Sequence, residues 1–198
     1  MTRIKLRRSL TVSVLAMLAG LPPFAPLKAA DITPDATASG ASPITGPSSG
    51  IRRGRSTGFP IPRFVSIKSN KAYMRVGPSM DYATKWVYSA RGLPMEIIEE
   101  YGNWRQVRDQ DGVTGWMLAP LLSGQRTAVV GPWYKKPVPL HYSPSRTSGI
   151  AAELAPKVRL YLKHCDGSWC DVSLQTQDLG GYVAQAALWG VYPQERID

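Results

Sequence analysis

The residues that could do chemistry are few and lie mainly in one stretch, HCDGSWCDV, which holds both cysteines of the chain, Cys165 and Cys170. Their spacing allows three chemistries: a disulfide, a metal site or a redox pair. Facing positions of a β-hairpin can reach the Cα separation of about 4.4–6.8 Å that a disulfide requires. We therefore predict a bond between the two cysteines. A metal site would add His164 and His141, but its ligand number and spacing differ from those of the common zinc motifs.

Beyond these residues, the sequence carries no motif of the common enzyme classes. It has two histidines, no serine or cysteine in a nucleophile motif, no HExxH and no glycine-rich phosphate loop. A convincing pair of carboxylates is missing as well. We predict that the chain is not an enzyme and that it needs neither a cofactor nor a metal.

The N-terminal thirty residues have the order of a secretory signal peptide. A basic stretch, MTRIKLRR, precedes the apolar run SLTVSVLAMLAGL, and small residues follow near Ala29 and Ala30. The apolar run is shorter than the ~20 residues of a spanning helix. The sequence thus predicts a signal peptide at 1–30, export to the periplasm or the extracellular space, and no membrane span after cleavage. An uncleaved anchor is the alternative.

The charge of the chain does not indicate a nucleic-acid partner. The formal net charge is +10, but residues 1–30 contribute +5 of it and residues 31–60 a further +1, which leaves +4 for residues 61–198. A nucleic-acid binder usually concentrates its basic residues in a stripe or patch. Residues 31–60 are rich in Gly, Pro, Ser, Thr and Ala and have no apolar period, which predicts a disordered linker.

From residue 61 on, the pattern is typical of an all-β protein. Short apolar runs such as RFVSIKS, AYMRV and KVRLYLKH are separated by Gly, Pro, Asn and Asp, and helical periodicity is nearly absent. The segment LPMEIIEE sits between turn signals and is predicted as a strand, since Met95 and Ile97 alternate with Glu96. SGIAAELA, residues 148–155, is the best candidate for a helix.

The sequence also repeats itself at an offset of 65 to 66 residues. Four segments recur in the same order: GPSMDYATKW at 77 and SPSRTSGIAA at 143, LPMEII at 93 and VRLYLK at 158, GNWRQV at 102 and GSWCDV at 167, and GWMLAPLL at 115 and GYVAQAAL at 181. This predicts two tandem β modules, at 61–127 and 131–195, joined by AVVGPW.

The first repeat resembles the bacterial SH3-like domain, a small β-barrel. The family pattern is a strand ending in Leu/Val-Arg-x-Gly-Pro-Ser, a Gly-Trp-x-x-Val strand, an Asp-Gly turn and a Gly-Trp-Val strand. The matching residues here are Met74, Arg75, Gly77, Pro78, Ser79, Gly102, Trp104, Val107, Asp111, Gly112, Gly115, Trp116 and Met117. The second repeat matches more loosely, because His141, Ser143 and Tyr182 differ from this pattern. The resemblance implies two tandem SH3-like barrels, the second diverged.

A binding site in such a barrel would use aromatic and basic side chains of the first repeat. The candidate ligand-binding residues are Tyr73, Arg75, Tyr82, Trp86 and Trp104. We expect Trp104 to be partly exposed and Trp116 to be largely core. Arg75 would either bind a carboxylate or brace its loop by pairing with Asp81 or Glu96.

The function that the sequence favours is binding without chemistry. The resemblance implies a peptidoglycan peptide, cell-wall glycan or another envelope protein as the partner of an exported adaptor. One alternative is a periplasmic scaffold that self-associates through exposed β edges, with Trp133 and Tyr134 of the junction buried between the barrels. Another is an accessory module of a cell-wall hydrolase system.

Overall fold

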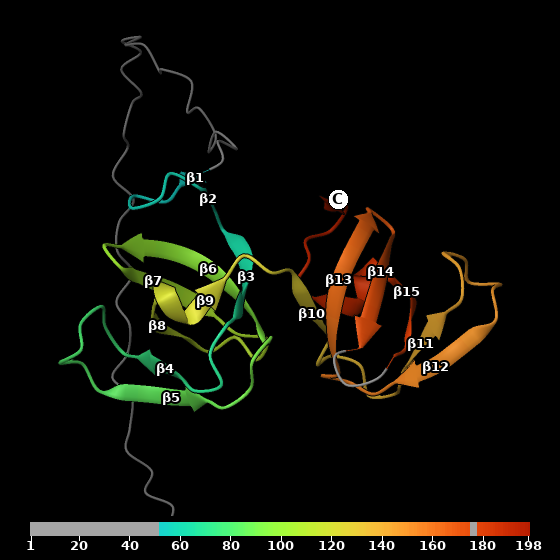
Figure 1. The fold of residues 1–198 in the computed structure, drawn as a ribbon, viewed down its shortest axis with the longest axis horizontal. Helices are drawn as coiled ribbons and strands as arrows, with labels where there is room; N and C mark the ends of the chain where they lie inside the picture. The colour runs from blue at the N-terminus through green and yellow to red at the C-terminus, as the bar shows by residue number, and fades with distance from the viewer. Residues whose placement is uncertain (1–51, 175–177) are drawn as a thin grey trace, which may run out of the picture. The chain divides into compact units, whose positions relative to one another are not determined.

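The computed structural model describes residues 52–174 and 178–198 (Figure 1). Within these ranges the chain consists of strands and two three-residue 3-10 helices, so the all-β prediction is confirmed. No helix of the described part is long and apolar enough to cross a membrane. The predicted signal peptide at 1–30 and residues 31–51 of the predicted linker lie outside the described residues.

The first repeat forms a seven-stranded antiparallel sheet in the order β5-β4-β8-β7-β6-β3-β9. Its elements are β3 (Arg63–Ile67), β4 (Ala72–Arg75), β5 (Thr84–Tyr88), β6 (Pro94–Tyr101), β7 (Trp104–Arg108), β8 (Thr114–Leu118), η1 (Ala119–Leu121) and β9 (Leu122–Ser123). One face of the sheet carries the core, which includes Met74, Met95, Ile97, Val107 and Met117. The strand predicted for LPMEIIEE is confirmed as part of β6.

The second repeat forms a sheet of the same topology, in the order β12-β11-β15-β14-β13-β10-β16. Its elements are β10 (Thr127–Val130), β11 (Val138–His141), β12 (Ile150–Leu154), β13 (Arg159–Asp166), β14 (Trp169–Leu174), β15 (Gly180–Ala184), η2 (Gln185–Ala187) and β16 (Leu188–Trp189). A further strand, β17 (Arg196–Ile197), pairs with β13. Because the strand orders correspond one to one, the predicted duplication is confirmed.

Two local expectations about the second repeat are wrong. Residues 148–155 contain the strand β12, not a helix, because backbone pairing with β11 outweighs the weak helical propensity of so short a segment. The junction AVVGPW, expected to link the modules, contains most of β10, the first strand of the second sheet. Its residues Val129 and Val130 are fully buried and belong to the packed interior.

The prediction of a disordered linker at 31–60 is wrong for residues 52–60. Strands β1 (Arg52–Arg53) and β2 (Pro60–Ile61) pair with each other. The loop between them covers Glu100, whose carboxylate accepts hydrogen bonds from the backbone N–H groups of Ser56 and Thr57 at 3.1 and 2.9 Å. The same carboxylate also accepts hydrogen bonds from the Thr57 hydroxyl and the Arg63 guanidinium. A buried carboxylate needs such donors, and composition alone does not reveal a partner so far along the chain.

Aromatic contacts connect the two sheets, which cluster into one compact unit. Phe64 of β3 packs against Trp189 and Tyr192, with ring centroids 5.1 and 4.7 Å apart. The Tyr192 hydroxyl donates to Glu96 of β6. Burial, together with the Glu96 charge, raises the pKa of Tyr192 above its ordinary value. This hydroxyl therefore stays protonated and remains a donor near neutral pH.

Candidate ligand-binding groove

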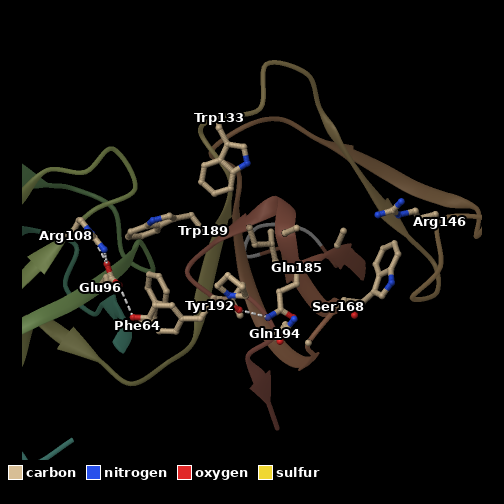
Figure 2. A pocket seen from close by; sticks show the side chains of 17 residues that line it. Phe64, Glu96, Arg108, Trp133, Arg146, Ser168, Gln185, Trp189, Tyr192 and Gln194 are labelled. Carbon is tan, nitrogen blue, oxygen red and sulfur yellow. Dashed lines mark hydrogen bonds and ion pairs between the residues drawn. The ribbon is translucent and has the colours of Figure 1, made fainter. Parts of the chain in front are cut away.

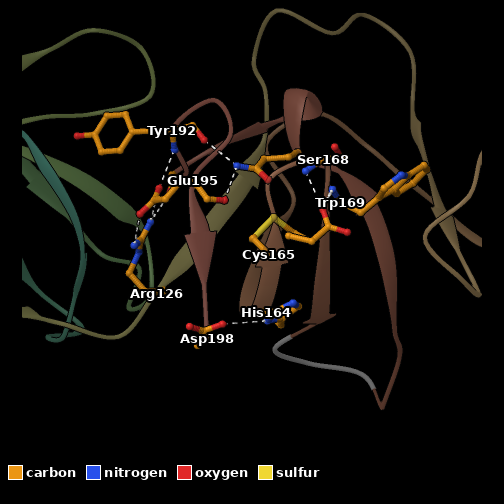
Figure 3. Close-up of a disulfide and its surroundings, with 12 residues drawn as sticks. Arg126, His164, Cys165, Ser168, Trp169, Tyr192, Glu195 and Asp198 are labelled. Atoms are coloured by element: carbon orange, nitrogen blue, oxygen red, sulfur yellow. Dashed lines mark hydrogen bonds and ion pairs between the residues drawn. A yellow bond between two sulfur atoms is a disulfide. The ribbon is translucent and has the colours of Figure 1, made fainter.

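The predicted disulfide is present between Cys165 and Cys170, with an S–S distance of 2.06 Å (Figure 3). The two residues face each other across the β13–β14 hairpin and both are fully buried. Since each sulfur is bonded to the other, neither is available as a thiolate ligand. Among the described residues no cluster of three or more His, Cys, Asp or Glu side chains could hold a metal ion.

Arg75 braces its loop, but through a different partner from those expected. Its guanidinium donates to the backbone carbonyl of Tyr82 at 2.6 Å, not to Asp81 or Glu96. Asp81 instead accepts the Ser79 hydroxyl at 2.8 Å. The loop after β4 is thus closed by a hydrogen bond from the Arg75 side chain to the backbone. Charge complementarity does not predict such a bond.

The five predicted ligand-binding residues do not all share one face of the first sheet. The register places Arg75 opposite Trp116, and Trp116 opposite Gln106, so these lie on the same face as Trp104. Trp86 pairs with the core residue Met74 and therefore belongs to the other face, where it is 55 % exposed at the sheet edge.

The expectation that Trp116 is largely core is wrong. It is only half-buried, because its neighbour Met117 is the residue that alternation turns inward. Trp104 is half-buried, as expected. Tyr73 and Tyr82 are exposed, and Tyr82 packs so closely on Gly77 that a side chain there would collide with its ring. None of the five predicted residues lines either of the two larger cavities described below.

On the matching face of the second repeat, the sheet carries a hollow. A cavity of about 410 Å³ lies over Trp169, which is the counterpart of Trp104. Its other lining residues are Tyr134, Pro137, Val138, Pro139, His141, Arg146, Ile150, Ala184 and Ala187. The cavity has an aromatic wall, an aliphatic floor and one arginine at its edge.

Two exchanges between the repeats explain why this face is hollow in the second one. Trp104 pairs with Leu118 in the first repeat, whereas Trp169 pairs with the much smaller Ala184 in the second. One strand further on, in β11, Pro139 occupies the place of Tyr73. Both exchanges remove side-chain volume on the same side of the tryptophan, over β15 and β11, where the smaller cavity lies.

The position of Trp169 is fixed from several directions. Asp166 accepts the backbone N–H groups of Ser168 and Trp169 at 2.7 and 2.8 Å, which closes the hairpin turn, and these same N–H groups lower the pKa of Asp166. His141 meets the indole ring edge-on, with centroids 5.4 Å apart. The histidine is itself held by a 3.1 Å hydrogen bond to the carbonyl of Ser148, which requires Nδ1–H as donor. A ring fixed in this way is a preorganised wall for a ligand.

Trp169 also lines a second cavity, of about 690 Å³, whose lining side chains are drawn in Figure 2. It shares Arg146, Trp169 and Ala184 with the smaller cavity. Among its further lining residues are Trp133, Trp189 and Tyr192. The two cavities are therefore neighbouring lobes of one surface, which we call the Trp169 groove.

The junction aromatics are not buried between the barrels as the scaffold hypothesis expected. Trp133 is 55 % and Tyr134 37 % exposed, and each lines one lobe of the groove. Trp133 lies over Gly131, where a side chain would collide with the indole. Sequence reasoning missed Trp133, Tyr134 and Arg146 as site residues. The sequence pattern that could have indicated them is the aromatic segment GPWYKKP, together with the small residues that lie opposite Trp169 in the second repeat.

Two curled sheets that share the same order of seven strands, with β17 added to the second, define a tandem SH3-like protein. The chain belongs to the bacterial SH3 domain family: the profile described as "Bacterial SH3 domain" matches residues 68–124 and again 134–190. Domains of this family are commonly cell-wall binding modules.

Comparison with curated proteins gave no match. Among solved structures, "Structure of NlpC1 from Trichomonas vaginalis" is similar at 15 % identity and a TM-score of 0.30. The match covers 69 % of this chain and 48 % of that one, so the chain spans about half the length of that structure. A likeness this low does not bear on function.

Proposed function

We propose that this chain is a non-catalytic binding module that acts outside the cytoplasm and binds peptidoglycan through the Trp169 groove. The observation that carries the proposal is the groove itself, in which Trp169 forms the common wall of two cavities of about 410 and 690 Å³. Cavities of this size with aromatic walls are typical of ligand-binding sites. The family assignment supports a ligand of the cell wall.

The disulfide supports an extracytoplasmic location for this activity. Such bonds persist in oxidising compartments and are rare in the cytosol, where thiols are kept reduced. The Cys165–Cys170 bond lies in the hairpin that carries Trp169. An oxidising compartment would therefore preserve a bond that stabilises the groove.

The test is co-sedimentation of the purified chain with peptidoglycan sacculi. Trp169→Ala should weaken retention at least ~10-fold, because central aromatic residues dominate such interfaces. Trp104→Ala is the matched control: it removes the same side chain from the equivalent position of the first repeat and should change retention less than ~2-fold. Tyr134→Ala, at a more exposed position, should also weaken retention if Trp169→Ala perturbs folding by circular dichroism.

Other outcomes would redirect or end the proposal. Loss on Trp104→Ala with Trp169→Ala unaffected would place binding on the first repeat, around Tyr73 and Arg75. A wild-type chain that stays in solution with sacculi would contradict peptidoglycan binding altogether. Release of soluble fragments from labelled sacculi would contradict the non-catalytic assignment.

A second candidate function, self-association, is favoured by the edge strand β5. It pairs on one side only, and its Trp86 and Val87 are 55 and 44 % exposed. Unpaired edges of this kind can join two copies. Sedimentation velocity over a range of concentrations separates the candidates, because a scaffold would give a dimer that Trp86→Lys dissociates, whereas a binding module would remain monomeric.

A further inference from the structure

The loop between β10 and β11 is longer than its counterpart in the first repeat. It comprises the seven residues 131–137, whereas the four residues 68–71 join β3 to β4. The longer loop holds two aromatic residues, Trp133 and Tyr134, followed directly by two lysines, Lys135 and Lys136. We call residues 133–136 the WYKK loop. All four side chains are exposed, so this loop presents aromatic and basic groups together to the surroundings of the protein.

The backbone of this loop is fixed before any partner binds. The Tyr134 N–H donates to the Gly131 carbonyl at 3.1 Å and closes a turn whose second residue is Pro132. Proline is favoured at that position, because its ring presets the required backbone angle. The Gly131 N–H donates to the Ala187 carbonyl at 2.8 Å and ties the turn to η2. A loop held in this way loses little conformational entropy when it docks on a surface.

The charge of the WYKK loop is not neutralised by the protein itself. Neither Lys135 nor Lys136 forms a hydrogen bond or an ion pair within the part of the chain that the structure describes. Arg146 lines the smaller cavity together with Tyr134, which brings a third cation to the same region. Glu153 of the neighbouring strand β12 pairs with neither lysine. The loop and its surroundings are therefore complementary to an anionic surface.

Unpartnered lysines alone would not distinguish this loop, but their combination with exposed aromatic rings does. The equivalent loop of the first repeat also carries two exposed lysines, Lys68 and Lys71, and has no aromatic residue. The β1–β2 hairpin carries an exposed aromatic residue, Phe59, among several arginines. There, however, the guanidinium groups of Arg52 and Arg53 bind oxygen atoms of the chain itself.

This combination fits the surface of a phospholipid bilayer. Tryptophan and tyrosine rings are amphipathic and favour the level of the lipid headgroups. A lysine ammonium near an anionic bilayer is attracted to it, which raises the affinity roughly 5-fold for each basic residue. Lysine acts as a flexible point charge and does not require a partner of defined geometry, as suits a fluid surface. A short projecting loop can make all of these contacts at once.

We propose that the WYKK loop docks the second repeat on an anionic phospholipid membrane. Trp133 and Tyr134 lie at the level of the headgroups, and Lys135 and Lys136 contact the lipid phosphates. This inference goes beyond the proposed function and does not depend on it. The two aromatic residues also border the Trp169 groove, but the two lysines line neither of its cavities. The lysines are therefore the residues that separate membrane docking from binding in the groove.

The test is co-sedimentation of the full chain with sucrose-loaded vesicles of phosphatidylcholine, alone or with about 30 % phosphatidylglycerol, because the second composition supplies the negative surface potential. The wild type should partition onto the anionic vesicles at least ~10-fold more strongly, and added salt should weaken this binding by screening. The double variant Lys135→Gln/Lys136→Gln should lower partitioning at least ~10-fold, since each lysine contributes roughly 5-fold. The same variant should remain bound to peptidoglycan sacculi.

Two matched controls test the loop itself. Lys68→Gln/Lys71→Gln removes the same charge from the equivalent loop of the first repeat and should change partitioning less than ~2-fold, because those lysines lie away from the docked surface. Trp133→Ala should weaken partitioning at least ~5-fold, since the indole no longer reaches the headgroups. Trp86→Ala is its control. Both tryptophans are 55 % exposed, but only Trp133 adjoins the lysine pair, so Trp86→Ala should have little effect.

The outcomes separate this inference from the proposed function. Equal losses in the two lysine double variants would show that net charge alone drives binding, and the proposal would be wrong. Equal partitioning onto neutral and anionic vesicles would also overturn it. Binding to a sulfated dextran without binding to vesicles would assign the loop to an anionic glycan instead. If the chain binds anionic vesicles but not sacculi, the inference stands and the proposed function falls, and retention by sacculi without vesicle binding has the reverse meaning.

Discussion

Glu100 and Arg105 face each other across the first repeat's hairpin, at the two positions that Cys165 and Cys170 occupy in the second. The Arg105 guanidinium lies 3.6 Å from the Glu100 carboxylate, and both residues are buried. Each pair also lies beside a segment that flanks its sheet: the β1–β2 loop covers Glu100, and β17 pairs with β13 at Cys165. The same hairpin end is thus closed by charge in one repeat and by a covalent bond in the other.

Glu100→Gln should destabilise the first repeat and remove part of its acid sensitivity. Burial alone would raise the pKa of Glu100, but hydrogen bonds from Arg63, Thr57 and Ser56 outweigh it and lower the pKa to about 2 from an ordinary 4.5. A depressed carboxyl pKa stabilises the folded state above the unfolded-state value. This contribution, on the order of 3 kcal/mol at neutral pH, is lost as the pH falls from about 4.5 towards 2.

Urea unfolding between pH 7 and pH 2.5 measures this effect. The difference in unfolding free energy between wild type and Glu100→Gln should be largest above pH 4.5 and shrink below it. Glu99→Gln serves as the control, since its ion-pair partner Arg52 is 64 % exposed and the pair should contribute less than about 1 kcal/mol. A difference that stays constant over the whole pH range would contradict the role assigned to Glu100.

Removing the disulfide should weaken the second repeat moderately and leave it folded. The bond joins residues only five apart in sequence, and a loop of that length gives about 2 kcal/mol in the chain-entropy treatment. We expect Cys165→Ala/Cys170→Ala to lower the unfolding free energy by that amount. Comparison of denaturant curves measures it. Complete loss of structure would mean that the bond holds the whole fold and not only the Trp169 hairpin.

Gly115→Ala should destabilise the first repeat by about 1–3 kcal/mol through overpacking. A methyl group at this position would collide with the Met74 side chain and lie 2.8 Å from the Arg75 carbonyl oxygen. Gly124→Ala is the matched control, because nothing lies within 4 Å of the added carbon there. Thermal unfolding should separate the two variants. Equal stability would show that the strands β4 and β8 can move apart at no cost.

Much of the fold could be predicted from local patterns. The alternation of apolar residues and the constant repeat offset predicted both sheets. The DQDG turn also forms as expected, with Gly112 at a φ of 81°. Asp109 anchors this turn by accepting the backbone N–H groups of Asp111 and Val113. The ordered segment 52–60 escaped prediction because its partner, Glu100, lies over forty residues away.

The site was harder to predict than the fold. The resemblance to the family placed the predicted binding residues in the first repeat, where Arg75 and Trp104 fit the family pattern best. The groove arises instead from losses of volume, such as Ala184 in place of Leu118. A missing side chain leaves no motif in a sequence, and its effect is visible only when strand register shows which residue lies opposite it.

The most direct test of the central claim is a nitrogen-15 NMR titration of the full chain with soluble peptidoglycan stem fragments. Binding in the Trp169 groove should shift the indole N–H of Trp169 and the backbone signals of Tyr134 and Arg146 most strongly. Largest shifts at Trp86 and Trp104 would place the site on the first repeat. A spectrum that does not change at millimolar fragment would contradict the account of the second repeat as the binding module.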